Sequence, residues 1–205
     1  MLVYPPGGPQ LPGHMLLVPL AHVPSVAAAE EGAYEELNAF KAALHAMWGA
    51  QGRAPLFLET ATRLASHASH AAIHCVPLPA QAAGEAPLFF RKALLESEEW
   101  TTNAPLLDTA GRGLRRAIPP GFPYFHVAWA GGGMVHPIEA EDDFPPSLGM
   151  DTLAGMLGVD PPSFGARARR KPQAKDARAL FEEQRAGVLH FLKAWEPFDF
   201  TKELG

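Results

Sequence analysis

Ser-His-Ala-Ser-His-Ala-Ala-Ile-His-Cys-Val-Pro-Leu-Pro, residues 66–79, is the stretch on which the interpretation of the fold depends. If this stretch is a β-strand, its side chains alternate between the two faces of a sheet. One face then carries His70, Ala72, His74 and Val76, and the other carries Ala71, Ile73 and Cys75. The second face is apolar and suited to burial, whereas the first presents two imidazoles separated by a methyl group. The stretch therefore predicts a half-buried strand with a candidate binding surface at His70 and His74.

The same stretch resembles the histidine-triad motif, in which three histidines alternate with apolar residues along one strand. In that superfamily the middle histidine attacks phosphorus, and the two flanking histidines orient it and bind phosphate oxygens. Ala72 stands at the middle position here, and a register with His74 in the middle would place Ala72 and Val76 at its flanks. The resemblance implies a triad strand without its nucleophile. The alternative is that His70 and His74 are ordinary polar residues of a half-exposed strand.

The residues upstream of this stretch predict a strand, a helix and a second strand. Gly13-His14-Met-Leu-Leu-Val-Pro-Leu-Ala-His22 predicts a short strand that Pro19 closes. Ser25 is expected to cap a helix of about 25 residues. The apolar stripe of this helix recurs at helical spacing and comprises Tyr34, Leu37, Phe40, Leu44 and Met47 or Trp48. Residues 54–59 predict the second strand.

His22 is a third candidate site residue. Triad proteins carry a segment similar to residues 13–22, and its last histidine lies beside the histidine row. The alternative is a surface histidine that leads into the following helix. The order of strands and helix also matches the triad architecture, which is an antiparallel sheet with a helix packed on it.

The residues downstream predict a further helix, a β-hairpin and two more helices. Residues 86–103 predict an amphipathic helix with Pro87 in its first turn and with Phe90 and Leu94 facing inward. Residues 124–129 and 134–139, joined by a triple-glycine turn, predict the hairpin, with an edge or a bulge at Pro137. Phe144-Pro-Pro-Ser147 leads into a helix that carries Leu148, Leu153, Met156 and Leu157. The last helix, from about Asp176, places Phe181, Val188, Phe191 or Leu192 and Trp195 along one stripe.

Taken in order, these segments resemble the two carboxyl-terminal domains of the CwfJ-like splicing proteins, over roughly residues 3–202. The resemblance implies an α+β fold. Residues 1–103 would form a histidine-triad-like antiparallel sheet with packed helices, and residues 104–205 a second, smaller α+β domain of a hairpin and helices. The family region normally starts upstream with a further strand and a cysteine pair. This sequence is expected to begin after them, which puts in doubt any zinc or partner site built from those parts.

Composition limits the classes of function. The net charge is −5, which argues against charge-driven nucleic-acid binding over the whole surface. Local contacts are expected instead from two basic clusters, which are Arg112, Arg115 and Arg116, and Arg169, Arg170 and Lys171. Each cluster is more typical of a solvated loop or a localisation-type signal than of an RNA contact. Cys75 is the only cysteine, so an internal disulfide and a cysteine-based zinc site are excluded.

No cofactor and no metal is expected. Neither a signal peptide nor an apolar run of the roughly 20 residues that a membrane span needs is present, so a soluble, intracellular protein is expected.

The resemblance implies a nuclear, non-catalytic RNA- or RNP-binding protein of the late spliceosome. Its expected partners are spliceosomal proteins, the intron lariat and the lariat debranching enzyme. One alternative is a nucleotide hydrolase or transferase with an altered triad, in which His74 or His70 is the nucleophile. It is disfavoured because an attacking nitrogen must lie about 3–3.5 Å from phosphorus, and the central position is Ala72. A protein–protein scaffold of splicing factors is the other alternative.

Overall fold

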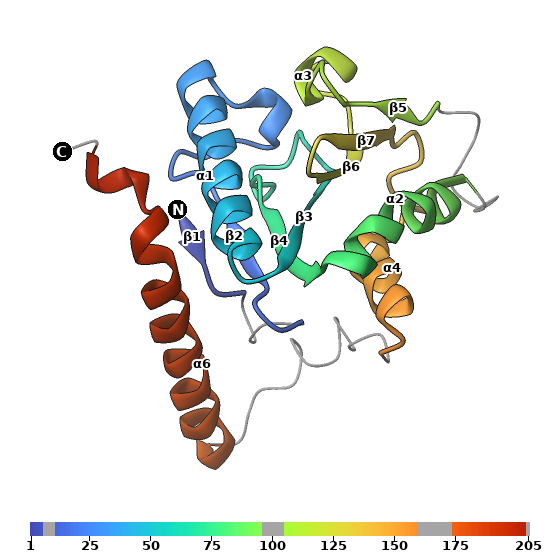
Figure 1. The fold of residues 1–205 in the computed structure, drawn as a ribbon. Helices are drawn as coiled ribbons and strands as arrows, with labels where there is room; N and C mark the ends of the chain where they lie inside the picture. Colours follow the sequence, from blue (N-terminus) through green and yellow to red (C-terminus); the bar gives the residue numbers. More distant parts are fainter. Residues whose placement is uncertain (6–10, 96–104, 160–173, 204–205) are drawn as a thin grey trace.

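The fold is built around one antiparallel sheet. The computed structural model describes residues 1–5, 11–95, 105–159 and 174–203 (Figure 1). Within these residues seven strands pair in the order β1-β2-β4-β3-β6-β7-β5. The strands are β1 (Leu2–Val3), β2 (Met15–Leu17), β3 (Arg53–Ala61), β4 (Ile73–Pro79), β5 (Leu107–Asp108), β6 (Tyr124–Trp129) and β7 (Gly132–Pro137). Every pairing is antiparallel, and helices cover the sheet, so the predicted α+β class is confirmed.

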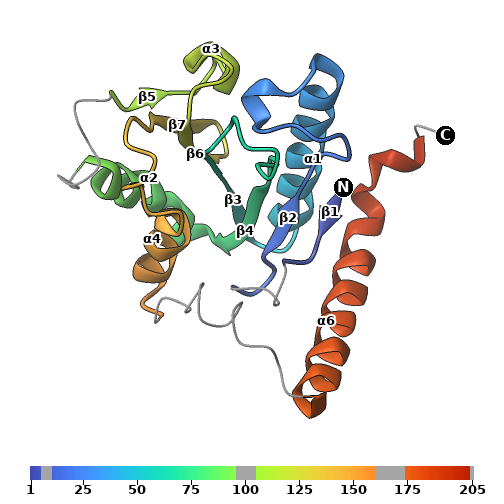
Figure 2. The same cartoon turned by 180° about the vertical axis from the view of Figure 1, so that it is seen from behind.

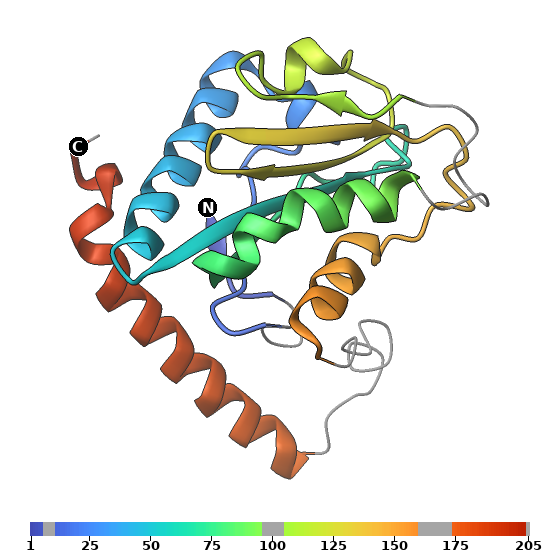
Figure 3. The ribbon, with the colours of Figure 1, turned by 45° about the vertical axis from the view of Figure 1, so that its right-hand side comes forward.

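The helices lie on both faces of the sheet. Figures 1 and 2 show α1 on one side of β3 and β4, and Figure 3 shows α2 and α4 on the other. The α-helices are α1 (Glu31–Gly49), α2 (Ala80–Leu95), α3 (Leu114–Ala117), α4 (Leu148–Leu157) and α6 (Ala174–Trp195). The 3-10 turns are η1 (Val26–Ala28), η2 (Glu196–Phe198) and η3 (Phe200–Glu203).

Two hydrophobic cores follow from the alternation of side chains along the central strands. On one face, Phe57 and Cys75 are buried under α1, whose buried stripe is Leu37, Phe40, Leu44, Met47 and Trp48. On the other face, Leu58 and Val76 are buried under α2 and α4. The predicted stripe of α1 is thus confirmed. Because β3 and β4 are covered on both faces, their central residues, 54–58 and 75–78, are apolar without interruption.

The first long helix begins later than predicted. Ser25 caps η1, where its Oγ accepts a hydrogen bond from the Ala28 N–H at 3.3 Å, and α1 starts only at Glu31. The reason is tertiary. The Val26 N–H donates to Glu59 Oε1 at 2.8 Å, and the Ala27 N–H donates to the Tyr124 hydroxyl at 3.1 Å. These bonds hold η1 against the sheet, and the extended backbone of Ala29 and Glu30, with ψ of 149° and 160°, separates η1 from α1.

The second long helix begins earlier than predicted. It follows β4 directly, so that Pro87 is the eighth residue of α2 rather than part of its first turn. The preceding segment is rich in alanine, the strongest helix former, and this favours the earlier start. Phe90 and Leu94 are fully buried, as predicted. Residues 96–104, into which the predicted helix continued, lie outside the described residues.

The predicted hairpin is confirmed as β6 and β7, and it joins the two halves of the sequence. Residues 57–61 of β3 pair with residues 124–128 of β6, so strands from both halves share one sheet. β5 pairs with β7 at Met134 and Val135, and the Thr109 N–H donates to the Gly133 carbonyl just beyond them. Pro137 therefore lies beyond this pairing, where its missing N–H costs no ladder bond. The division at residues 103/104 stays a prediction about the units of the sequence.

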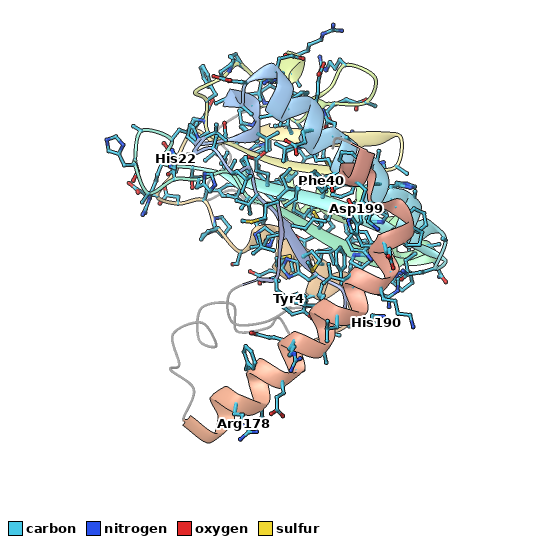
Figure 4. All side chains as sticks on the ribbon, turned by 90° about the vertical axis from the view of Figure 1, so that its left-hand side faces the viewer. Tyr4, His22, Phe40, Arg178, His190 and Asp199 are labelled. Atoms are coloured by element: carbon cyan, nitrogen blue, oxygen red, sulfur yellow. The ribbon has the colours of Figure 1, made fainter. Side chains whose placement is uncertain are left out.

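Helix α6 returns to the first half of the chain. Near its end, Trp195 stacks on Phe40 of α1 with ring centroids 5.9 Å apart. Figure 4 shows Tyr4 beside the middle of α6, and Arg178 at its beginning, away from the sheet. Phe181, predicted to share the stripe of Trp195, is 64% exposed. Only the later turns of α6 therefore bury the stripe.

Candidate functional site

The predicted histidine strand is shorter than its pattern indicates. β4 begins at Ile73, so His74 lies in the strand, while His70 and Ala72 precede it. The neighbouring strand explains this limit. β2 pairs Leu17 with Ile73, and the next hydrogen-bonding position along β2 is Pro19, which has no N–H to donate. The Ala71 N–H instead donates to the carbonyl of Val23 at 2.8 Å.

His22 and His70 form an exposed pair. Their rings stack with centroids 5.1 Å apart and an interplanar angle of 15°. A carbonyl oxygen only accepts, so His70 Nε2 donates to the Pro19 carbonyl at 3.1 Å, and its Nδ1 accepts from the Val23 N–H at 3.4 Å. His70 thus uses both ring nitrogens on the backbone. In Figure 4 His22 lies on the side of the molecule away from α6.

His14 and His74 form a second pair, in which His14 is fully buried and His74 half-buried. His14 Nε2 lies 3.0 Å from His74 Nδ1, and the rings stack with centroids 5.1 Å apart. Burial, reinforced by His74, lowers the pKa of His14 to about 3, and burial lowers the pKa of His74 to about 4. Both imidazoles are therefore neutral at pH 7, and one donates to the other. Gly13, at a φ of +82°, brings its Cα so close to Pro77 that a Cβ would lie 2.8 Å from that ring.

The four histidines are arranged as two pairs and not as a row of three. Ala72, at the place of the nucleophile, offers no nitrogen, and both nitrogens of His70 are bonded to the backbone. His74 Nδ1 faces His14, and burial keeps His74 uncharged. His22 is the member whose side chain is exposed and stacked rather than bonded to the backbone. This arrangement suits contact with an anion at His22 better than attack on phosphorus.

The predicted arginine contacts have different surroundings. The Arg115 guanidinium lies 4.1 Å above the ring of Tyr34, forms an ion pair of 2.5 Å with Glu31, and donates to the Ala29 carbonyl. It therefore attaches α3 to the start of α1. Arg112 Nε donates to the Asp108 carbonyl at 2.5 Å, and Arg116 is exposed. Arg169, Arg170 and Lys171 lie outside the described residues.

His14 is the residue that the sequence reasoning did not select. The sequence placed His14 at the start of the predicted first strand, but only the pairing of Leu16 with His74 in the structure shows that His14 lies beside His74. Among the described residues, no group of three or more His, Cys, Asp or Glu side chains is placed to hold a metal ion. No helix in the described ranges is both long and apolar enough to cross a membrane.

Comparison with known proteins gives matches over nearly the whole chain. A family model described as "protein similar to CwfJ C-terminal" matches residues 2–91, and one described as "protein similar to CwfJ C-terminus 2" matches residues 99–201. The chain is 36% identical over 192 residues to CWF19-like protein 2 of Homo sapiens and 39% identical over 192 residues to that of Danio rerio. These matches cover 93% of the chain but only 20% and 19% of those proteins.

A more distant relative has a name that states its process. The pre-mRNA-splicing factor cwf19 of Schizosaccharomyces pombe is 29% identical over 206 residues, which cover 93% of the chain and 30% of that protein.

Proposed function

The chain belongs to the family of CwfJ-like carboxyl-terminal domains, and from this membership we propose that it acts in pre-mRNA splicing as a non-catalytic RNA- or RNP-binding protein. The proposal places it in the nucleus, in the late spliceosome, with the intron lariat and the lariat debranching enzyme as partners. The splicing role is supported by the name of the Schizosaccharomyces pombe relative. That the chain contacts RNA, the intron lariat and the debranching enzyme is a more specific proposal, which goes beyond that name.

The observation that carries the RNA-binding part is the exposed pair of His22 and His70 beside a strand without a nucleophile. The backbone contacts of His70 hold its ring in place, and the stacked ring of His22 is presented to solvent. An exposed imidazole can donate a hydrogen bond to a phosphate oxygen, and it does so more strongly when protonated. Such a contact binds a phosphate backbone without cleaving it. Arg116 is a second exposed donor.

The test is RNA binding by a variant that changes only the exposed ring. His22→Ala is expected to weaken binding of a branched RNA oligonucleotide 2- to 12-fold, which corresponds to one net hydrogen bond. Fluorescence anisotropy at fixed salt concentration measures the affinity. His190→Ala is the matched control, because it removes an exposed imidazole from α6. Equal affinity of the His22→Ala variant and the unmodified chain would place the RNA contact elsewhere, and no binding by the unmodified chain would favour the protein scaffold.

Nucleotide hydrolysis is tested on the same preparation. Incubation with a dinucleoside polyphosphate or with adenosine phosphoramidate is expected to give no turnover, because Ala72 replaces the attacking imidazole. Turnover that His74→Ala abolishes would instead establish an altered triad and refute the non-catalytic proposal.

A further inference from the structure

A pocket lies on the face of the sheet opposite to His74. It has a volume of about 510 Å³ and opens between α1, β6 and the connection from β5 to α3. Sites for small molecules in proteins usually measure about 300–1,000 Å³. Five polar side chains line it, which are Asn38, Lys41, His45, Thr109 and His126. Neither family resemblance nor the histidine motif assigns a role to these residues.

Lys41 provides a positive charge in this pocket. The side chain is half-buried, and its Nζ lies 5.9 Å from the centroid of the Phe57 ring. Within the described ranges the ammonium forms no hydrogen bond and no ion pair shorter than 4 Å. An ammonium carries three donors. Lys41 therefore retains hydrogen-bonding capacity toward the pocket.

Glu59 is the acidic group that acts on Lys41, but its carboxylate is already used. Oε1 accepts from the Val26 N–H at 2.8 Å, and Oε2 accepts from the Tyr124 hydroxyl at 2.7 Å. Burial lowers the pKa of Lys41, and the charge of Glu59 opposes this effect. Glu59 thus partly offsets the effect of burial on the pKa of Lys41, although burial raises the pKa of Glu59 as well, and it occupies none of the Lys41 donors. Among the described residues that line the pocket there is no Asp or Glu.

The neighbouring side chains offer neutral hydrogen-bonding groups. Burial and the charge of Lys41 lower the pKa of His126 to about 3, so its imidazole is neutral at pH 7. His126 Nε2 lies 3.3 Å from Thr109 Oγ1. Asn38, Lys41 and His45 follow one another at helical steps of three and four on α1, so they share one face of that helix. One cation and several neutral donors are the chemistry that receives a phosphate group.

We propose that this pocket binds a phosphate monoester of mononucleotide size, with its phosphate on Lys41. One water molecule occupies about 30 Å³. A phosphate group is only a few times larger than a water molecule, so a pocket of about 510 Å³ has room for much more than a phosphate. Tyr34 and Trp129 also line it and supply aromatic surface for the nucleoside part. The ligand is a free nucleoside monophosphate or the terminal nucleotide of an RNA strand. This site lies on the other face of the sheet from the His14–His74 pair, and neither His22 nor His70 lines it.

The test is titration calorimetry with adenosine 5′-monophosphate, adenosine and inorganic phosphate. The monophosphate is expected to bind at least tenfold more tightly than either of the other two. Lys41→Met is expected to weaken its binding about 10- to 100-fold, the value of a charge-assisted hydrogen bond. Asn38→Asp changes an exposed residue at the pocket and is expected to weaken binding through charge repulsion without affecting the core. Lys193→Met, which removes an exposed charge from α6, is the matched control and is expected to bind normally.

Several results would overturn the proposal. Unchanged affinity in a folded Lys41→Met or Asn38→Asp variant would exclude the pocket. Equal binding of adenosine and its monophosphate would exclude a phosphate subsite, and equal binding of inorganic phosphate and the monophosphate would exclude the nucleoside part. Loss of binding in His22→Ala but not in Lys41→Met would place the nucleotide at the histidine pair. A 5′-phosphorylated trinucleotide, added as a competitor, distinguishes a terminal RNA nucleotide from a free nucleotide. If this trinucleotide competes no better than its unphosphorylated form, the pocket binds only the free nucleoside monophosphate.

Discussion

At the scale of single residues, the buried imidazoles link the stability of the fold to pH. His14 is fully buried against half-buried His74, and His126 is buried under α1. Burial disfavours the charged form of each imidazole, so the folded chain keeps all three neutral where an unfolded chain binds protons. The His14–His74 hydrogen bond also requires that one ring accept, and protonation of both rings would abolish it. This pair is therefore a structural contact between β4 and the residue that precedes β2.

The pH dependence of unfolding tests this interpretation. An unfolded histidine titrates near pH 6.5, whereas His14 and His74 titrate at about 3 and about 4 in the folded chain. Between these values the unfolded chain binds more protons, so stability falls as the pH is lowered. From pH 7 to pH 5 the free energy of unfolding is expected to fall by up to about 2 kcal/mol for each of these histidines.

Urea unfolding at the two pH values provides the measurement. The double variant His14→Leu, His74→Leu is expected to lose correspondingly less stability between pH 7 and pH 5. An equal loss in the unmodified chain and in the variant would show that the pair does not titrate as its burial requires.

At the scale of elements, local patterns predicted which segments are helix or strand, but not where each begins. The apolar stripe of α1 and the hairpin of β6 and β7 followed from periodicity and glycine placement alone. Before α1 starts, η1 is attached to the sheet by Glu59 and Tyr124, which lie far along the chain and bind the amides of η1. The start of the histidine strand at Ile73 depends on Pro19, which lies two residues past the end of β2. Boundaries set by such distant partners are invisible to a local pattern.

Pro87 is expected to destabilise helix α2. It lies in the interior of α2, where proline removes a backbone hydrogen bond and its ring crowds the preceding turn, at a cost of about 3 kcal/mol. Proline also restricts the unfolded chain, which offsets up to about 1 kcal/mol. Pro87→Ala is expected to raise the free energy of unfolding by about 1–2 kcal/mol, measured by chemical denaturation.

Gly84→Ala is the matched comparison for Pro87→Ala. It lies in the same helix, where an added Cβ meets no atom within 4 Å, and its gain is expected to be about 1 kcal/mol or less. A lower stability of Pro87→Ala would show that the proline ring itself packs favourably.

At the scale of the whole molecule, the sequence predicted the family but not which residues meet. The order of motifs identified the CwfJ-like family, and the family models confirm it. The pocket at Lys41 escaped prediction because α1 supplies Lys41 and β6 supplies His126, and their meeting depends on β6 pairing with β3. The same pairing brings the two halves of the sequence into one sheet.

This shared sheet leads to a prediction about cooperativity. β3, β4 and Phe40 belong to the first half, and β6, α4 and Trp195 belong to the second. Residues from both halves are buried together in each of the two cores, and Trp195 stacks on Phe40. We therefore expect urea unfolding to give one transition, with the same midpoint by far-UV circular dichroism and by tryptophan fluorescence. Val127→Ala, at a fully buried position of β6 opposite Leu58, removes two methyl groups and is expected to cost about 2 kcal/mol.

Because the halves share the β3–β6 ladder, the Val127→Ala substitution should lower the midpoint seen by both probes equally. Trp48, on α1, reports on the first half, and Trp129, on β6, reports on the second. Single-tryptophan variants that retain one or the other separate the two signals. If Val127→Ala shifted only the Trp129 signal, the halves would be independent folding units. A common shift would instead mean that a substitution in β6 also lowers the stability of the segment that carries His22 and His70. The reason is that the pocket at Lys41 and this histidine pair depend on the same sheet.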